Sequence, residues 1–271
     1  MEIEEASRAD MAELPKAFLR WAGSKRLLLS TLETYWSANR RYVEPFCGSA
    51  SLFFRLRPNT SILGDINSLL IETFRAVQSD ADAVSNILAS YAPTSEQFYR
   101  LRLMGIKGIS ATETAARFIF LNRNCFNGLY RTNRAGMFNV PFSGKRSGIL
   151  PTRDQLRACG EALRNSTLIH ADFESVLNNV DRGDFVYLDP PYAVRNVRVF
   201  RQYGPDSFGL DDIQRLGLTH RSAPSHLLDS AGCRAAFMPP QLQGKAIDSN
   251  LARSLSARVD DSQAMSADGT C

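Results

Sequence analysis

Residues 41–65 constrain the fold of this chain more than any other stretch. A strand-like run, residues 41–46, is closed by the turn Cys47-Gly48-Ser49, and a helical segment starts directly after it. A second strand-like run, residues 61–64, then ends at Asp65. Strand, glycine turn, helix, strand and acid, in that order, are typical of a nucleotide-binding βαβ unit. The pattern therefore predicts a parallel, Rossmann-like sheet.

Two later strand-like runs, residues 167–170 and 184–188, extend this sheet. Before them the periodicity is helical from about residue 80 to 124, and a Gly-, Asn-, Arg- and Pro-rich loop follows from 126 to 148. A structureless loop of that length in a compact domain is usually functional. We therefore predict an α/β, Rossmann-like domain that is split by a helical, basic insertion. The predicted bounds are 15–79 and 161–216 for the sheet domain, 80–160 for the insertion and 217–271 for a C-terminal tail.

The tail differs from the rest of the chain in composition. Of the 26 aromatic residues (2 Trp, 8 Tyr and 16 Phe), only Phe237 lies beyond Gly217, and the tail is rich in Ser, Ala and Asp. A segment so poor in large apolar side chains buries too little surface to offset the entropy of ordering it. We predict no strand in residues 218–271, an irregular or disordered tail, and a sheet whose C-terminal part is incomplete.

Cysteine and histidine usage argues against metal and disulfide chemistry. The five cysteines include no Cys-x-x-Cys pair, and the three histidines have no ligand spacing. A reducing, cytoplasmic setting fits such scattered cysteines. The sequence shows no signal peptide and no apolar run long enough to span a bilayer. We therefore expect no metal and no membrane.

Positive charge is concentrated in the predicted insertion. The net charge of the chain is only +4, yet residues 114–153 contain seven Lys or Arg residues and no acidic residue. A local cationic field of this kind suits a polyanion such as nucleic acid. A solvated basic face without a ligand is the alternative.

The four residues Asp189-Pro190-Pro191-Tyr192 directly follow the last strand-like run. A prolyl turn after a buried strand is the simplest interpretation. The same residues can also surround one planar amine. Asp189 and the rigid Pro190 carbonyl would accept hydrogen bonds from the two amino hydrogens, which directs the nitrogen lone pair at an electrophilic methyl group. With Tyr192 stacked on the ring, the motif is equipped to methylate the exocyclic amine of a nucleobase.

The first βαβ unit contains candidates for holding the methyl donor, S-adenosylmethionine. Gly48 lets the backbone approach a ligand closely, and Asp65 could accept hydrogen bonds from adenosine hydroxyl or amino groups. The loop lacks the full Gly-x-Gly-x-x-Gly pattern, so a simple tight turn is an equal alternative. Read alone, Trp21 fits the core as well as a ligand, and Lys25 is typical of a solvated lysine at a helix start.

Taken together, these residues resemble the DNA adenine N6-methyltransferases of the Dam type (the D12 class). The likeness runs from about Phe18 to Leu216, in the family's order of donor loop, target-recognition insertion and catalytic motif. The matching segments are Phe18-Leu19-Arg20-Trp21-Ala22-Gly23-Ser24-Lys25, Val43-Glu44-Pro45-Phe46-Cys47-Gly48, Gly64-Asp65-Ile66-Asn67, Leu121-Asn122-Arg123, Asn127-Gly128-Leu129-Tyr130-Arg131, Phe138-Asn139-Val140-Pro141-Phe142 and Asp189-Pro190-Pro191-Tyr192.

The resemblance implies S-adenosylmethionine as the cofactor and a role for each matching residue. Residues expected to contact the donor or the target amine are Trp21, Lys25, Phe46, Gly48, Asp65 and Asp189. Arg131 would read a guanine through a bidentate contact, worth about 1–3 kcal/mol of discrimination. Phe126 would wedge into the stack that the extruded adenine has left. The other residues expected at the DNA are Arg20, Asn127, Leu129, Asn133 and Pro141, and the expected site is a short palindrome such as GATC.

The sequence departs from the family's pattern at three places. Ser24 and Ala50 stand where the family commonly has Gly. Beyond Leu216 the family's Ile-Ser-Asn-type strand and closing hairpin are missing, as though the chain continued in another reading frame. We expect a monomer that methylates adenine in double-stranded DNA, with a truncated, inactive DNA-binding remnant as the alternative. A nicotinamide oxidoreductase on a similar sheet is a weaker alternative, because this sequence contains neither the usual dinucleotide-binding fingerprint nor a candidate acid–base pair.

Overall fold

The computed structural model describes residues 15–106, 108–133 and 135–190, the residues Asp212 and Arg215, and the strand Arg234–Phe237. The chain divides into two units, Met1–Ala236 and Phe237–Cys271. Phe237 alone of the second unit belongs to the described residues. Within the described part of the chain, no helix is long and apolar enough to cross a membrane.

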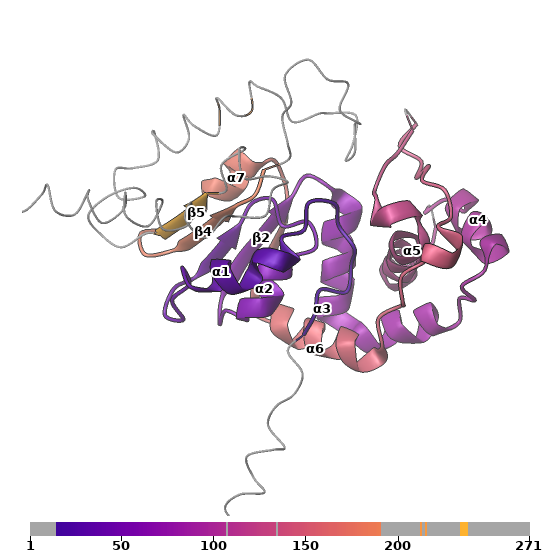
Figure 1. Cartoon of the computed structure of the whole chain (residues 1–271), viewed down its shortest axis with the longest axis horizontal. Helices are drawn as coiled ribbons and strands as arrows, with labels where there is room; N and C mark the ends of the chain where they lie inside the picture. The colour runs from indigo at the N-terminus through magenta and orange to yellow at the C-terminus, as the bar shows by residue number, and fades with distance from the viewer. Residues whose placement is uncertain are drawn as a thin grey trace, which may run out of the picture. The chain divides into compact units, whose positions relative to one another are not determined.

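A sheet of five strands carries the fold (Figure 1). The strands β1 (Tyr42–Glu44), β2 (Ser61–Asp65), β3 (Ser166–His170), β4 (Phe185–Leu188) and β5 (Arg234–Phe237) lie in the order β3-β2-β1-β4-β5. β1 pairs in parallel with β2 and with β4, and β2 pairs in parallel with β3. Val43 at the centre is in register with Ile62 on one side and Val186 on the other. The predicted α/β, Rossmann-like sheet is confirmed.

Strand β5 corrects one prediction. We expected no strand in residues 218–271, yet Arg234–Phe237 forms a strand next to β4. The run Arg-Ala-Ala-Phe contains no β-branched residue and no clear alternation, so its sequence gives little strand signal. Pairing is instead favoured by the neighbour, because β4 would otherwise present unpaired backbone groups at an open edge. The rest of the predicted tail lies outside the described residues.

The helices surround the sheet and build the insertion. The elements beside the strands are η1 (Arg26–Leu28), α1 (Leu29–Glu33), α2 (Ser51–Leu56), α3 (Ser68–Ala89), α6 (Arg153–Leu163) and α7 (Phe173–Leu177). Those of the insertion are α4 (Ser95–Leu103), α5 (Ala111–Asn124), η2 (Phe126–Gly128) and η3 (Gly144–Arg146). Thr152 caps α6, where its side chain accepts a hydrogen bond from the Gln155 amide.

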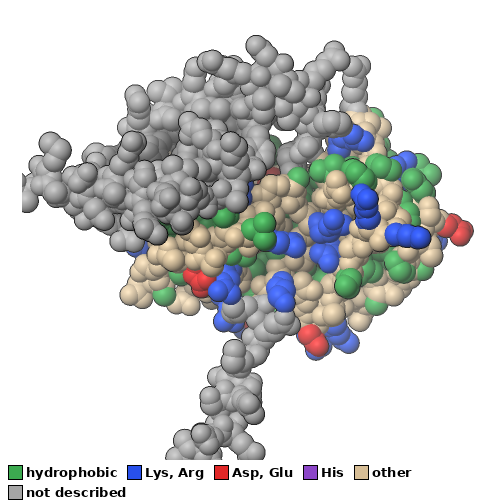
Figure 2. Space-filling view, in the orientation of Figure 1, with side chains coloured by type: hydrophobic (Ala, Val, Ile, Leu, Met, Phe, Trp, Pro, Cys, Tyr) green, Lys and Arg blue, Asp and Glu red, His purple; other side chains and the backbone are tan. Residues whose placement is uncertain are grey.

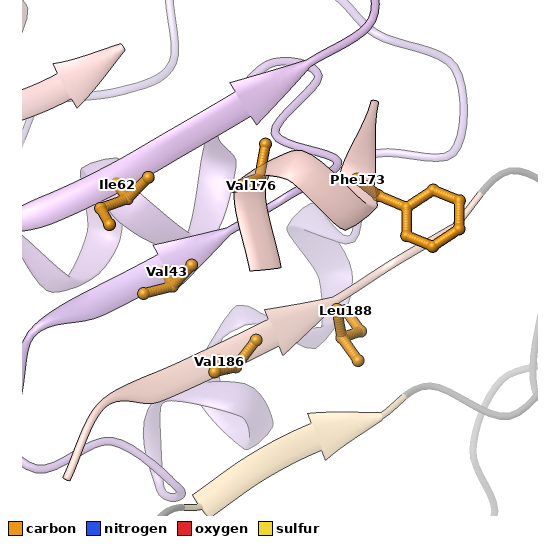
Figure 3. Close-up of a cluster of buried hydrophobic side chains, with 6 residues drawn as sticks. All are labelled: Val43, Ile62, Phe173, Val176, Val186 and Leu188. Carbon is orange, nitrogen blue, oxygen red and sulfur yellow. The ribbon is translucent and has the colours of Figure 1, made fainter. Parts of the chain in front are cut away.

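A cluster of buried side chains joins the strands β1, β2 and β4 to the helix α7 (Figure 3). The buried side chains of this cluster are Val43, Ile62, Phe173, Val176, Val186 and Leu188. Gly64 of β2 allows α7 to lie this close, because a Cβ at Gly64 would come within 2.4 Å of a methyl group of Val176. The glycine is thus required by packing, and it fixes α7 against the sheet near the end of β2.

The predicted start of the insertion, residue 80, coincides with a kink in α3. Asp80 interrupts α3 with an extended backbone (φ −155°, ψ 81°), and its carboxylate accepts a hydrogen bond from the Ala83 amide, as an N-cap does. α5 packs against α3 (Figure 1). We expected a structureless loop over residues 126–148, which is wrong in part. Two short antiparallel bridges, Cys125 with Phe142 and Thr132 with Phe138, close this loop on itself.

Candidate active site

The predicted donor and catalytic residues gather at the carboxyl ends of adjacent strands. β1 lies between β2 and β4, so the loop after β1, Asp65 at the end of β2 and Asp189 directly after β4 share one edge of the sheet. The chain runs from β1 outward to β2 and β3, then returns to place β4 on the other side of β1. Ligands of open α/β sheets bind where the strand order reverses in this way.

Asp189 is paired with Lys25. The Lys25 Nζ lies 2.7 Å from both carboxylate oxygens and also donates to the Gly23 carbonyl at 2.9 Å. Both side chains are largely buried, with 11% of Lys25 and 18% of Asp189 exposed. Burial raises the pKa of Asp189, and the charge of Lys25 opposes that rise. Lys25 is therefore not the solvated lysine that its local sequence allows.

Asp65 holds both the loop after β1 and the turn after β2 through its carboxylate. Its Oδ2 accepts a hydrogen bond from the Gly48 amide at 3.0 Å, and its Oδ1 accepts one from the Asn67 amide at 2.9 Å. Burial raises the pKa of Asp65 to about 6, although these amides and the nearby His170 act in the opposite direction. A carboxylate has about four acceptor positions. Asp65 can therefore hold the Gly48 loop and still accept hydrogen bonds from a ligand.

Trp21 connects the loop after β1 with the insertion. Its ring stacks on Tyr130, with centroids 6.0 Å apart and planes inclined by 17°. On the other side it lies so close to Gly48 that a Cβ there would be 2.6 Å from the Trp21 Cδ1. Gly48 also has a φ of +46°, in the left-handed region that favours glycine. Trp21 is partly exposed, so its ring borders the functional edge.

Phe46 and Phe173 form an aromatic pair beside Asp65. Their ring centroids lie 5.4 Å apart, and Phe46 remains partly exposed. Ile66, which follows Asp65, exposes 57% of its surface. Phe173 was not among the predicted site residues. The only sequence signal for it is its place three residues after the end of the expected strand, at the start of α7.

Glu44 is a second residue to which sequence reasoning gave no role. Its carboxyl group is buried at the end of β1 and accepts a hydrogen bond from the Tyr42 hydroxyl at 2.9 Å. Burial raises its pKa well above the usual range, and the negative charges of Asp189 and Asp65 add to that rise. An acidic residue inside a strand that is expected to be buried could have indicated this role, since acidic residues are rarely buried without a partner.

The structure gives a physical meaning to the two small departures from the family's pattern. Ala50 has a φ of +50°, and a non-glycine residue in that region is strained by about 1–3 kcal/mol. Glycine would be free of that strain, which explains why it is expected there. Ser24 places its hydroxyl 2.9 Å from that of Ser51, the first residue of α2. This contact ties the segment before η1 to the helix after the donor loop.

The predicted wedge and its neighbours lie on the surface of the insertion. Phe126 exposes 42% of its surface, and Asn127 beside it is exposed with a φ of +54°. The Phe126 amide donates to the carbonyl of the exposed Pro141 at 2.9 Å, which brings these two predicted DNA contacts together. Leu129 is partly buried. An exposed aromatic ring at a strained turn is suited to insertion between bases.

The polar residues of the same loop are held by local hydrogen bonds. Arg131 donates from Nε to the Asn139 side chain at 2.7 Å. Asn133 shapes the tip, where its side-chain oxygen accepts from the Ala135 and Met137 amides, both at 3.0 Å. In Figure 2, Lys and Arg side chains gather over this part of the molecule, with few acidic ones among them. Pro190 is described, whereas Pro191 and Tyr192 lie outside the described residues.

The sheet order and the acids at its carboxyl edge define the class: a Rossmann-like methyltransferase. Comparison with known proteins identifies the family. Residues 21–232 match the model of the D12 class N6 adenine-specific DNA methyltransferases, and the chain belongs to this family. The match extends past Leu216, so the resemblance does not end where we expected it to.

Characterised relatives agree with this assignment. The chain is 34% identical over 212 residues to a DNA adenine methylase of Serratia marcescens, which covers 76% of this chain and 78% of that protein. It is 32% identical over 219 residues to the DNA adenine methylase of Escherichia coli (strain K12), covering 77% and 78%. The type II methyltransferase M1.LlaDCHI of Lactococcus lactis subsp. cremoris is 31% identical over 211 residues, covering 74% of each chain. The protein is an adenine-specific DNA methyltransferase, an enzyme class whose methyl donor is S-adenosylmethionine.

Proposed function

We propose that this enzyme methylates N6 of an adenine that is extruded from double-stranded DNA, within a GATC-like site, and that it acts as a cytoplasmic monomer. The observation that carries the catalytic part is the Lys25–Asp189 pair at the carboxyl edge of the sheet, beside the Gly48 loop. Three buried, unpaired cysteines (Cys47, Cys125 and Cys159) fit a reducing compartment.

The residues at this edge fit S-adenosylmethionine. The backbone at Gly48 packs directly against the Trp21 ring, because only glycine leaves room for that ring, and Asp65 keeps acceptor positions for hydroxyl or amino groups. The partly exposed Phe46, backed by the buried Phe173, would provide an apolar surface for the adenine ring. When bound, the donor supplies an electrophilic methyl group on its sulfonium sulfur. Trp21, Gly48, Asp65 and the Phe46–Phe173 pair would hold and orient it.

Asp189 would act on the target amine. Lys25 opposes protonation of the buried carboxylate and occupies one side of each oxygen, which leaves further lone pairs for an amino hydrogen. The Pro190 carbonyl would accept the second hydrogen. Both acceptors gain strength as positive charge develops on the nitrogen, so they stabilise the transition state more than the ground state. Tyr192 would stack on the extruded base.

The insertion would read the DNA. Asn139 holds Arg131 through Nε, and the guanidinium would contact the O6 and N7 of a guanine. Phe126 would fill the gap left by the adenine, with Asn127, Asn133 and Pro141 around it. Leu129 and Arg20 lie beneath this loop, where the stem of Arg20 packs against Gly128.

Expression in a host that lacks adenine methylation tests the proposal. Genomic DNA from cells that produce the wild-type chain is expected to contain N6-methyladenine at a defined site, and Asp189→Ala is expected to reduce it to background. Sequencing that detects the modified base identifies the site. A wild-type chain that is folded and binds duplex DNA but leaves no methyladenine would contradict the proposal and identify an inactive remnant.

A further inference from the structure

Tyr130 lies between two residues with proposed roles in different sites. It directly precedes Arg131, the proposed guanine reader. Its ring stacks on Trp21 at the donor edge, which is the carboxyl edge of the sheet where the methyl donor is proposed to bind; the two ring centroids are 6.0 Å apart and the planes are inclined by 17°. Only 8% of Tyr130 is exposed. A buried ring at this place can act on both sites without touching DNA.

Tyr130 anchors the loop that carries Arg131. Its ring packs on Phe138 in the opposite arm of the loop, with centroids 5.8 Å apart, and on Phe118 of α5, at 5.4 Å. The two arms are joined at Arg131, whose carbonyl accepts a hydrogen bond from the Asn139 amide at 3.0 Å and whose Nε donates to the Asn139 side chain at 2.7 Å. A shift of the Tyr130 ring would therefore displace the segment that positions the guanidinium.

Residues of the donor edge approach Tyr130 by two routes. On the first route, the Trp21 ring lies against Gly48, whose amide donates a hydrogen bond to Asp65 at 3.0 Å. On the second route, the Asn67 amide donates to the same carboxylate at 2.9 Å. Burial raises the pKa of Tyr130, and the nearby Asn67 side chain opposes that rise. The contacts of Asp65 thus reach Tyr130 on both sides.

The stack provides a route by which the donor can act on the loop. Trp21 is partly exposed, whereas Tyr130 is buried, so a ligand that contacts Trp21 acts on Tyr130 through that ring. Stacked aromatic rings attract each other beyond the effect of the surface that they bury. A ligand that fixes the Trp21 ring therefore also restricts Tyr130 and the segment that continues into Arg131.

We propose that Tyr130 is a positioning residue that couples occupation of the donor edge to the reading of the target site by Arg131. The inference deepens the proposed function and rests on it, since it takes the donor to contact Trp21 and Arg131 to contact a guanine. A bound donor holds the Tyr130 ring and orders Arg131 before the DNA arrives. The entropy of ordering that side chain then no longer opposes binding to the cognate site, whereas binding to an unrelated duplex gains nothing.

Duplex affinity with and without S-adenosylhomocysteine, the donor without its methyl group, measures the coupling. In the wild type this ligand is expected to tighten binding to a cognate duplex about fivefold more than binding to an unrelated duplex. Tyr130→Leu removes the stack and is expected to lose this factor, whereas Tyr130→Phe keeps the ring and is expected to retain it. Phe120→Leu is the matched control and is expected to retain the factor, because it removes a buried ring of the insertion that packs on Tyr91 instead.

Hydrogen exchange of the wild type tests the same coupling without a substitution. The Asn139 amide reports the state of the loop, because it donates to the Arg131 carbonyl. In the absence of DNA, saturating S-adenosylhomocysteine is expected to slow exchange of this amide about fivefold. By reciprocity, a cognate duplex should also tighten S-adenosylhomocysteine binding by the factor that the duplex measurements give.

The outcomes separate this inference from the proposed function. A wild type that binds S-adenosylhomocysteine and duplex DNA without preferential tightening at the cognate site would overturn the role of Tyr130 alone. The same holds if Tyr130→Leu keeps the wild-type factor, or if the bound ligand leaves exchange of the Asn139 amide unchanged. A wild-type chain that binds neither S-adenosylhomocysteine nor duplex DNA would overturn the proposed function itself.

Discussion

The carboxyl edge of the sheet and three neighbouring arginines (Arg20, Arg26 and Arg123, called here the arginine cluster) are two regions of like charge that the chain builds in opposite ways. At the edge, each acid is matched by a donor of the protein: a tyrosine hydroxyl for Glu44, backbone amides for Asp65 and Lys25 for Asp189. Among the described residues, the hydrogen bonds of these arginine side chains go to backbone carbonyls. The comparison teaches that the chain holds the acids of its catalytic edge with its own donors and holds the clustered arginines with main-chain acceptors.

Removing the cation from the edge is expected to give the largest effect. In Lys25→Met, kcat/KM at neutral pH should fall by about 10²-fold, within the range of a lost electrostatic contact at a reacting centre. Lys25 opposes the rise that burial imposes on the pKa of Asp189, so its loss lets that pKa rise further. Because the ionised carboxylate is the acceptor, the acid limb of the pH–rate profile should move to higher pH. Lys25→Arg should restore most of the shift, and an unmoved acid limb would contradict the role of the pair.

A methyl group at Gly48 tests whether the edge and the insertion are joined. Gly48→Ala is expected to lower the free energy of unfolding by about 1–3 kcal/mol and to weaken donor binding, because its Cβ meets Trp21 and its φ is positive. Gly183→Ala is the matched control, with a φ of +99° and nothing within 4 Å of the added carbon. Urea unfolding and donor titration measure both. Equal losses in the two variants would show that backbone strain alone is responsible.

Arg215 provides the smallest effect and the sharpest contrast with the arginine cluster. It pairs with Asp172, Glu174 and Asp212 at 2.7–2.8 Å, and about 39% of its side chain is exposed. Exposed ion pairs contribute little, so Arg215→Gln should lower the free energy of unfolding by about 1 kcal/mol or less. DNA affinity and its salt slope should stay unchanged, as binding assays can show. A clear loss of DNA affinity would remove the distinction between arginines held by carboxylates and arginines held by carbonyls.

The local sequence pattern predicted most strands of the sheet. It identified the site residues one by one, but it did not predict which of them contact each other. The predicted runs 61–64 and 167–170 became β2 and β3 with one residue more each, since strand periodicity is a local signal. Strand β5 was not predicted, because pairing with β4 favours it more than its own composition does. The contact of Lys25 with Asp189 joins residues 164 positions apart. No spacing rule encodes such a contact, and only the order of the strands brings the two together.

The same reasoning explains what was missed in the insertion. The resemblance named Arg20 as a DNA contact, but neither Arg26 nor Arg123 stood out in a segment rich in cations. Only the fold brings them beside Arg20, where each donates to a backbone carbonyl. The predicted domain bounds and the roles of the site residues remain predictions, and the experiments above address the roles directly.

The place of Trp21 has a practical consequence for spectroscopy. The chain contains two tryptophans, and Trp36 packs edge-on against Tyr42 and Phe185 of strands β1 and β4. Replacing Trp36 by Phe would leave one indole, stacked on Tyr130 and touching the Gly48 loop. Emission from that single fluorophore would respond to occupation of the donor edge and to movement of the insertion. The enzyme thus carries an intrinsic optical reporter at the junction of its two working parts.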